Sequence, residues 1–131
     1  MSASTILTAF NDHFMELLND IIRVFPEDVD ILSCKNTVTT VRKANPRLII
    51  QIWNNCIVVK YKDKIEAGNI EFFIDKDYSG DLANAENSSK VMEVIDRLRN
   101  PVKLMKREDQ DKTMKYMQNL TKLSVLYASI V

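Results

Sequence analysis

The stretch FNDHFMELLNDIIRVF, residues 10–25, decides the fold class that the sequence predicts. Its large apolar residues recur at steps of four, three, four and four positions along the chain. Side chains at this spacing lie on one face of an α-helix, so the stretch predicts an amphipathic helix with a buried apolar stripe. The stripe consists of Phe10, Phe14, Leu17, Ile21 and Phe25, and the predicted polar face consists of Asn11, Asp12, Glu16, Asn19, Asp20 and Arg23.

Prolines mark where the next two helices are predicted to begin. Pro26 excludes the residue before it from helical geometry and suits the first turn of a second helix. Asn45 and Pro46 predict the start of a third helix, because Asn caps free amides and Pro is preorganised for the first turn. Gly68 is a natural left-handed stop for that helix. The predicted buried residues are Ile31, Cys34, Val38 and Val41 in the second helix and Ile49, Ile52, Trp53, Cys56 and Val59 in the third, with Ile57 as a further candidate.

The second half of the chain predicts a short helical turn, a polar loop and two further helices. The turn covers residues 69–74, the loop covers residues 75–87, and a helix resumes near Ser88. Asn100 and Pro101 predict a break in that helix, followed by a short restart. The predicted stripes are Val91, Ile95 and Leu98 in this helix, Val102 and Met105 in the restart, and Met114, Met117, Leu120, Leu123 and Tyr127 in a last helix that begins at about Asp109 or Asp111.

Length and composition favour a single helical domain. The 131 residues are 46% hydrophobic and 27% charged, as expected for one ordinary globular domain with one core. Two Gly and three Pro leave little material for the tight turns that many short strands need. We therefore predict an all-α, single-domain bundle over residues 1–131, with about five principal helices and one or two short helical turns.

Cysteine usage and hydropathy predict a reducing, intracellular setting. Cys34 and Cys56 show neither a metal-binding nor a redox spacing, and a lone pair is no disulfide framework in a chain of this length. The start of the chain lacks a basic region followed by an apolar run, and the longest apolar stretches, such as CIVV, are too short to span a bilayer. We expect a soluble protein without a membrane span.

Charge is distributed unevenly along a chain whose formal net charge is zero. Residues 63–96 contain nine acidic and three basic residues, whereas residues 97–131 contain eight basic and three acidic ones. The two segments are either solvated faces that attract each other within the fold or surfaces that dock on neighbours of complementary charge. The bases, all within residues 97–122, could also contact phosphate. Nearby acids dilute them and the chain as a whole is neutral, which disfavours nucleic-acid binding.

Residues 75–86, DKDYSGDLANAE, have the spelling of an EF-hand calcium loop. Carboxylate and hydroxyl side chains, a turn glycine and a closing glutamate stand at the prescribed positions. The chain has no second loop of this pattern, although EF-hands normally stabilise each other in pairs, and the flanking segments do not suit the helices of such a hand. We therefore expect a connector between helices, with no metal and no other cofactor. The matching residues are Asp75, Asp77, Ser79, Gly80 and Glu86.

No catalytic motif accompanies the single histidine. His13 stands beside the apolar stripe of the first predicted helix, with Asp12 and Glu16 as neighbours, where it is either a partly exposed helix residue or a general base. No Ser, Cys or Lys is tied to it by a recognisable motif, and the chain has no Gly-rich phosphate loop. We therefore predict no enzymatic activity and no catalytic residues.

One set of flexible and aromatic side chains is a candidate docking surface. Methionines and tyrosines of the second half of the chain could form an adaptable groove, because methionine is flexible and polarisable. Such a stripe is more often simply core, and both interpretations remain open at this point. The residues are Met92, Met105, Met114, Met117, Tyr116 and Tyr127.

Five segments carry a resemblance to a known group of proteins. They are FNDHFMELLNDIIRVFPEDVDIL, RKANPRLIIQIW, YKDKIEAGNIEFFIDKDYSGDL, SKVMEVIDRLRNPV and MKYMQNLTKLSVLY, and they span most of the chain. In these segments the chain resembles small, largely uncharacterised proteins encoded by large icosahedral DNA viruses, the algal-virus and giant-virus group. The resemblance implies a helical, non-enzymatic viral protein, and the group offers no active site to carry over.

The resemblance also implies a place in the virion. Shells of such viruses need many adaptor-sized proteins beneath the major capsid layer. The leading hypothesis is therefore a minor capsid protein that binds other viral structural proteins, synthesised in the host cell cytoplasm and located in the virion. The competing hypothesis is a regulatory or nucleic-acid-associated factor made during infection, whose binding through the bases of residues 97–122 would weaken steeply with added salt. A single-loop calcium-binding protein is a further alternative.

Overall fold

The computed structural model describes residues 2–75 and 89–131. In these two ranges the backbone forms helices and turns and no strand, which confirms the predicted all-α fold. Five long helical stretches form one bundle, with one short helix between the third and the fourth. They are α1 (Ala3–Val24), α2 (Val29–Ala44), the continuous run of α3 (Leu48–Ile52), the π-helical η1 (Trp53–Val58) and α4 (Val59–Glu66), then the short α5 (Glu71–Asp75), α7 (Ser89–Leu104) and α8 (Arg107–Ile130).

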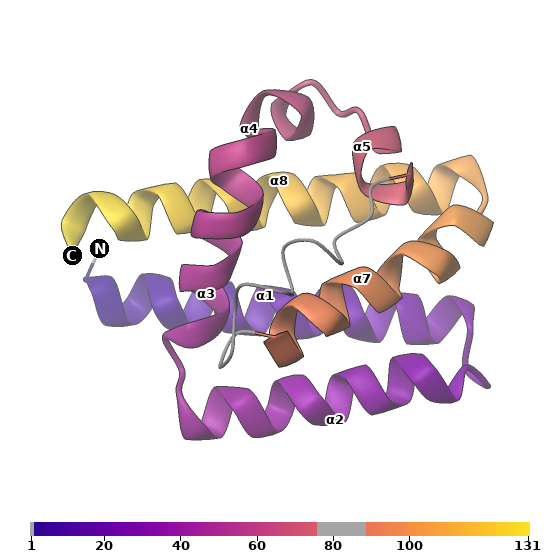
Figure 1. The fold of residues 1–131 in the computed structure, drawn as a ribbon, viewed down its shortest axis with the longest axis horizontal. Helices are drawn as coiled ribbons and strands as arrows, with labels where there is room; N and C mark the ends of the chain where they lie inside the picture. Colours follow the sequence, from indigo (N-terminus) through magenta and orange to yellow (C-terminus); the bar gives the residue numbers. More distant parts are fainter. Residues whose placement is uncertain (1, 76–88) are drawn as a thin grey trace.

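Helix α1 occupies the centre of the bundle (Figure 1). It packs along α8 on one side and along α2 on another, and α7 lies against α2. The α3–η1–α4 run crosses α1 and α8 steeply instead of running beside them (Figure 1). The two termini lie together at one end of the bundle (Figure 1), and α4, the last part of the crossing run, contacts α8.

Four of the five stripe residues that predicted α1 are buried as expected, whereas Phe25, the residue after the helix, is partly buried. Phe10, Phe14 and Ile21 have no exposed surface and Leu17 has almost none. At the start of the helix, the Oγ of Ser2 accepts a hydrogen bond from the backbone N–H of Thr5 over 3.2 Å. This cap satisfies one of the free amides of the first turn. The apolar spacing and the cap therefore account for α1 from local sequence alone.

Two residues predicted on the polar face of α1 are buried, which corrects that prediction. The side-chain amide of Asn11 donates a hydrogen bond over 3.0 Å to the backbone carbonyl of Pro46, which lies between α2 and α3. Asp20 faces α8 and accepts hydrogen bonds from cationic side chains. Other segments cover both polar side chains. Their burial is tolerable because neighbouring residues supply hydrogen-bond partners.

An aromatic cluster holds the crossing run against α1. The ring of Trp53 packs edge-on against Phe10 and Phe14, with centroid separations of 6.5 and 6.2 Å. Its indole N–H donates a buried hydrogen bond over 3.1 Å to the Oγ1 of Thr121 on α8. Aromatic pairs of this kind contribute about 0.5–1.5 kcal/mol beyond the area that they bury. Trp53 therefore joins α1, η1 and α8 at one point.

The π-helical turn η1 changes which residues of the crossing run are buried. Hydrogen bonds in a π-helix run from residue i to i+5, so the turn accommodates an extra residue and shifts the helix face that follows. The side chain of Val59 is 73% exposed, so the prediction that it is buried is wrong. The shift of the helix face after η1 explains this exposure. Val58 and Ile65 are buried in its place. Apolar spacing measured with a regular α-helical period does not anticipate this shift.

The predicted break at Asn100 and Pro101 does not occur. Helix α7 continues through Pro101 and ends at Leu104. Proline lacks an amide hydrogen and crowds the carbonyl four residues before it, which costs about 3 kcal/mol in a helix interior. Here Pro101 lies in the last turn, and both it and Val102 are buried. Tertiary packing therefore outweighs the local signal.

Three helix starts differ from the predicted positions by a few residues. Helix α2 begins at Val29 instead of Pro26, because Asp28 is the capping residue and its Oδ1 accepts from the N–H groups of Asp30 and Ile31. Helix α3 begins at Leu48, after the turn that follows Asn45. Helix α8 begins at Arg107, ahead of the predicted start.

Gly68 ends α4 with a backbone angle that favours glycine, as predicted. Its φ is +75°, and the N–H groups of Gly68 and Asn69 donate to the carbonyls of Ile65 and Lys64 over 3.0 Å each. This pair of bonds is the Schellman arrangement, which satisfies the last carbonyls of a helix.

We expect Gly68→Ala to lower the free energy of unfolding by about 1–2 kcal/mol, because an L-residue with a side chain is strained at positive φ. A Cβ would meet its nearest described atom, the Nε2 of Gln118, at 3.8 Å, so the loss should come from the backbone and not from a clash. Urea denaturation followed by circular dichroism measures the change. Gly68→Asn is the control and should lose less, because Asn tolerates the left-handed region. An Ala variant as stable as the parent protein would contradict this account.

Candidate functional site

A groove between α4 and the C-terminal half of α8 is the principal candidate for a binding site. Its volume is about 550 Å³. Residues of both helices line it, and we refer to it as the α4–α8 groove. Helix α4 contributes Lys62, Ile65 and Glu66, and α8 contributes Gln118, Thr121, Lys122, Val125, Leu126 and Ser129.

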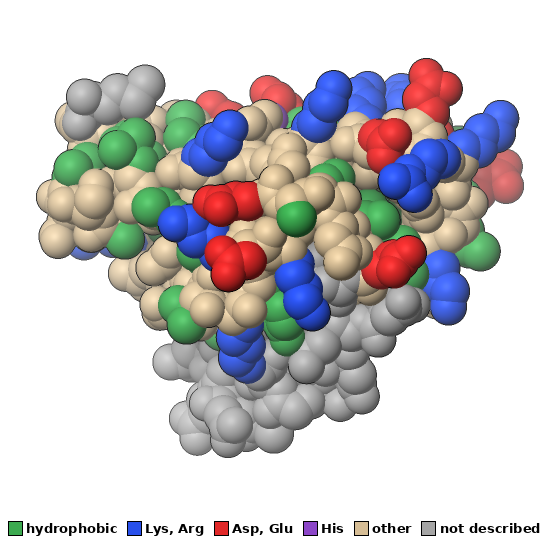
Figure 2. Space-filling view, turned by 90° about the horizontal axis from the view of Figure 1, so that it is seen from above, with side chains coloured by type: hydrophobic (Ala, Val, Ile, Leu, Met, Phe, Trp, Pro, Cys, Tyr) green, Lys and Arg blue, Asp and Glu red, His purple; other side chains and the backbone are tan. Residues whose placement is uncertain are grey.

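The floor of the groove is apolar. Ile65 is fully buried and Val125 is partly buried, whereas Leu126 is 43% exposed. Ile130 follows Leu126 one turn later on α8 and is also exposed. Figure 2, which views the molecule from above, shows hydrophobic side chains gathering toward the end where the two termini lie. The groove thus has solvent-exposed apolar surface that is available for a partner to cover.

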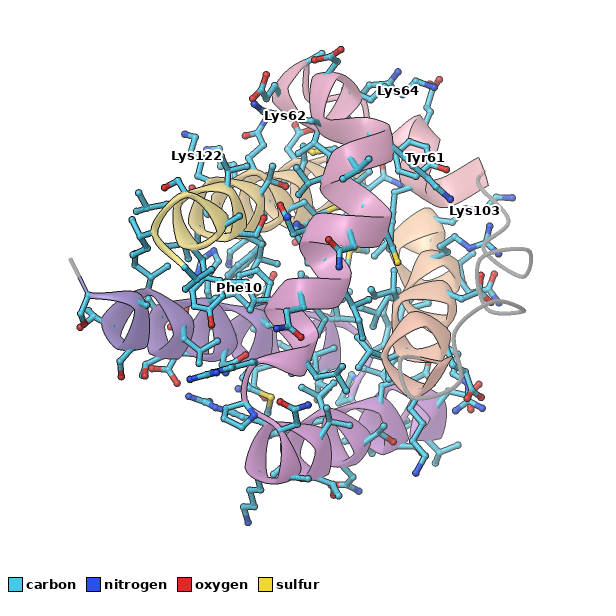
Figure 3. The ribbon with its side chains drawn as sticks, turned by 60° about the vertical axis from the view of Figure 1, so that its left-hand side comes forward. Phe10, Tyr61, Lys62, Lys64, Lys103 and Lys122 are labelled. Atoms are coloured by element: carbon cyan, nitrogen blue, oxygen red, sulfur yellow. The ribbon has the colours of Figure 1, made fainter. Side chains whose placement is uncertain are left out.

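The rim of the groove carries a net positive charge. In Figure 3, Lys62 of α4 and Lys122 of α8 lie where the two helices face each other, whereas Tyr61 and Lys64 lie on the other side of α4. Lys62 is 3.8 Å from the Oε1 of Glu66, and both side chains are about half exposed, so this pair is weak. Lys122 forms no ion pair with any described residue. A negatively charged partner is therefore favoured over a positive one.

Two long-range hydrogen bonds hold the walls of the groove together. The side-chain amide of Gln118 donates over 3.0 Å to the carbonyl of Ile65, near the end of α4. The indole of Trp53 donates to Thr121 at the base of the groove. Because both bonds join α8 to the crossing run, the groove is formed before any partner binds, which lowers the ordering cost of binding.

The docking surface proposed from methionines and tyrosines is mostly core. Three methionines and one tyrosine of that set are buried in the bundle, Tyr116 is partly buried, and the side chain of Met92 lies outside what the structure describes. The groove residues were missed because they lie on the polar side of α8, where Leu126 and Ser129 follow no apolar stripe. Only their position opposite α4 makes them a site. The buried members of the set are Met105, Met114, Met117 and Tyr127.

A polar cluster lies inside the α1–α8 interface. The Oδ1 of Asp20 accepts from the Nε of Arg23 over 3.2 Å and from the Nζ of Lys112 over 3.1 Å. Its Oδ2 is buried and has no partner among the described residues. Arg23 is also 3.8 Å from Asp109 on α8. Desolvation by burial, and secondarily the Asp20 carboxylate, raises the pKa of the nearby Tyr116 above its ordinary value. The cluster joins two helices through one shared carboxylate.

His13 lies against α8 and away from the α4–α8 groove. Its ring centroid is 4.8 Å from that of Tyr116, and its Nδ1 is 3.4 Å from the Oε2 of Glu16. Its Nε2 is buried and has no hydrogen-bond partner among the described residues. The structure thus places the single histidine in the packing of α1 on α8.

The basic residues of 97–122 do not form a continuous positive surface. Four of the eight form ion pairs, with N–O distances of 2.5 to 3.1 Å. In three of these pairs both residues belong to the same helix, twice in α7 and once in α8, whereas the fourth pair joins Lys112 of α8 to Asp20 of α1. Figure 2 shows positive and negative side chains interspersed on the face that it presents. The pairs are Arg97–Glu93, Arg99–Asp96, Arg107–Asp111 and Lys112–Asp20.

The candidate calcium loop lies almost entirely outside the described residues. Asp75 is the last residue of α5, and residues 76–86 fall in the range that the structure does not describe. Within residues 2–75 and 89–131, no group of three or more His, Cys, Asp or Glu side chains is placed to hold a metal ion. The calcium hypothesis therefore stays a hypothesis about the sequence.

The cysteines and the helix lengths bear on two further expectations. Cys34 is buried and Cys56 is partly buried, and neither is part of a disulfide bond. Burial raises the pKa of the Cys34 thiol above its ordinary value, against a smaller opposing effect of Arg97, so the reactive thiolate is scarce at neutral pH. None of the described helices is long and apolar enough to cross a membrane.

Comparison with known proteins assigns no family to the chain. No family model, no curated protein and no solved structure matches it. The grounds for proposing a function are therefore the α4–α8 groove and the resemblance of the sequence segments.

Proposed function

We propose that this protein is a non-enzymatic interaction protein, a small virion component such as a minor capsid protein that binds other viral structural proteins. The α4–α8 groove is the observation that carries the proposal. A preformed groove with an apolar floor and a positive rim suits a protein segment whose apolar side chains are flanked by carboxylates. The place in the virion comes from the resemblance of the sequence and not from the groove.

The exposed apolar side chains of α8 supply most of the binding free energy in this proposal. Leu126 and Ile130 are partly exposed and lie one turn apart. Full burial of such a side chain contributes about 1.5–3 kcal/mol, so a partner that covers both gains part of that amount at each. Lys62 and Lys122 orient the partner and raise its association rate more than they tighten the complex.

The nucleic-acid-associated alternative has less support. Contacts to phosphate need several unpaired basic side chains along one surface. Four of the eight bases of residues 97–122 are paired with carboxylates of the described residues, including Lys112, which is held by the buried carboxylate of Asp20. A protein partner therefore remains the better-supported class.

Site-specific photo-cross-linking in purified virus particles tests the proposal. A photoactivatable amino acid replaces Leu126 in the groove, and the matched control replaces Val59, which is exposed on α4 but does not line the groove. We expect the protein to copurify with particles of the virus that encodes it. We also expect position 126, and not position 59, to cross-link to a viral structural protein. Absence of the protein from the particles, or equal cross-linking at both positions, would contradict the proposal.

A further inference from the structure

The N-terminal turn of α2 presents the kind of segment that the α4–α8 groove suits. Val29 is 75% exposed and Leu32 is 39% exposed. They are three positions apart on a helix, so their side chains lie on the same face. Glu27 and Asp30, both exposed, stand beside them. We call these four residues the α2 knob.

The α2 knob is held in shape before any contact forms. The Oδ1 of Asp28 caps the helix by accepting from the N–H groups of Asp30 and Ile31 over 3.0 and 3.3 Å. Ile31 is fully buried and anchors the same turn to the core. A segment that is already ordered loses little conformational entropy on binding, so more of the interaction free energy is available for association.

Other exposed apolar side chains have the wrong charges beside them. Val59 and Leu104 are as exposed as Val29, but each is next to a lysine, Lys60 or Lys103. The remaining exposed apolar residues of the described chain belong to the groove side of α8 and to its end. Among the exposed apolar residues of 2–75 and 89–131, Val29 and Leu32 are the ones whose nearest charged neighbours along the chain are carboxylates.

We propose that the α4–α8 groove of one copy of this chain binds the α2 knob of a second copy. The inference rests on the proposed function, because it names an occupant of the same groove. In Figure 1 the start of α2 lies beside the end of α1, whereas the C-terminal half of α8 extends toward the opposite end of the bundle. Knob and groove are therefore far apart within one chain, and the contact between copies is head-to-tail.

Charge favours this arrangement over a symmetric contact of groove with groove. In the head-to-tail contact, Val29 and Leu32 cover the apolar floor while Glu27 and Asp30 approach the lysines of the rim. A symmetric contact of groove with groove would bring Lys62 and Lys122 against their own copies, which is repulsive. A head-to-tail contact that does not close into a ring continues into an open chain, an arrangement that suits a structural protein.

Sedimentation velocity of the full chain over a range of concentrations tests the inference. We expect the average mass of the parent protein to rise with concentration. Leu126→Glu disables the groove and Val29→Lys disables the knob, and each variant alone should associate at least about tenfold more weakly, a difference of about 1.4 kcal/mol. Val59→Glu is the control, because it changes an equally exposed residue outside both surfaces, and it should associate like the parent protein.

A mixture of the two disabled variants gives the sharpest readout. The Leu126→Glu chain keeps an intact knob and the Val29→Lys chain keeps an intact groove, so one of each should form a dimer. That dimer retains one disabled groove and one disabled knob and should grow no further. Dimer formation also demonstrates that both variants are folded. A mixture that stays monomeric, a parent protein that stays monomeric, or a Val59→Glu chain that is equally impaired would overturn the inference.

The outcomes separate this inference from the proposed function. A monomeric parent protein whose position 126 cross-links to a structural protein in virus particles would overturn self-association alone. Self-association of a chain that is absent from the particles would support the inference and contradict the proposed place of the protein in the virion. Failure of both readouts would remove the groove as a binding site altogether.

Discussion

Trp53→Ala is expected to lower the free energy of unfolding by about 3–5 kcal/mol. The ring is almost fully buried between Phe10, Phe14 and the base of the α4–α8 groove, so its removal leaves a cavity where three helical stretches meet. It also leaves Thr121 without its buried donor. Because domains of this size are stable by about 5–15 kcal/mol, the variant should lose a large part of its stability. Urea denaturation must be followed by circular dichroism, since the chain has one tryptophan and the variant has no indole fluorescence.

The hydrogen bond and the packing can be separated by a double-mutant cycle. Thr121→Val keeps the side-chain shape but leaves the indole N–H without an acceptor, at a cost of about 1–3 kcal/mol. The same change in a Trp53→Phe background should cost less, because no donor is left unsatisfied. Equal costs in the two backgrounds would show that the bond contributes nothing. A Trp53→Ala chain within 1 kcal/mol of the parent would show that the crossing point is not part of the core.

The second large effect is expected at the buried carboxylate of α1, where Asp20→Ala should cost about 2–3 kcal/mol. Removing one partner of a buried ion pair costs about 3–5 kcal/mol when the remaining charge stays buried. Arg23 and Lys112 are about half exposed and can regain water, so the expected loss is smaller. The same denaturation experiment measures it.

Two further variants show whether burial is the cause. Asp12 lies on the same helix and pairs with Arg42 over 2.6 Å, but it is exposed, so Asp12→Ala should cost less than about 1 kcal/mol. Combining Asp20→Leu with Lys112→Met replaces the charges of the interface by apolar side chains and should recover part of the loss. If Asp12→Ala and Asp20→Ala lost the same stability, the burial of Asp20 would not explain its effect.

Local sequence signals predicted the helices because the information lies within each helix. Apolar residues at steps of three and four positions identify the buried face of α1 without reference to any other element. Gly68 stops α4 because the required backbone angle suits glycine. The cap of α2 by Asp28 is equally local, although the prediction placed the start of that helix at Pro26. Each of these signals depends only on a few consecutive residues of the chain.

The same kind of reasoning failed where a neighbouring element changed the local preference. Pro101 predicts a break, but a buried position in the last turn of α7 makes continuation favourable. Val59 continues an apolar spacing, but the π-helical turn before it rotates it toward water. Asn11 and Asp20 read as polar surface, yet partners from distant segments allow their burial. In each case the energy of tertiary packing exceeds a local preference of a few kcal/mol at most.

By itself, the sequence determined that this protein is an all-α bundle, because helix formation depends on contacts between residues three and four positions apart. Only the tertiary structure decided that the protein has a groove with a positive rim. The hydrogen bonds that position its walls join Trp53 to Thr121 and Ile65 to Gln118, residues separated by 68 and 53 positions. No periodicity within one helix records which face of a distant helix lies opposite. Packing of the crossing run against α8 therefore creates the site from residues that appear ordinary along the chain.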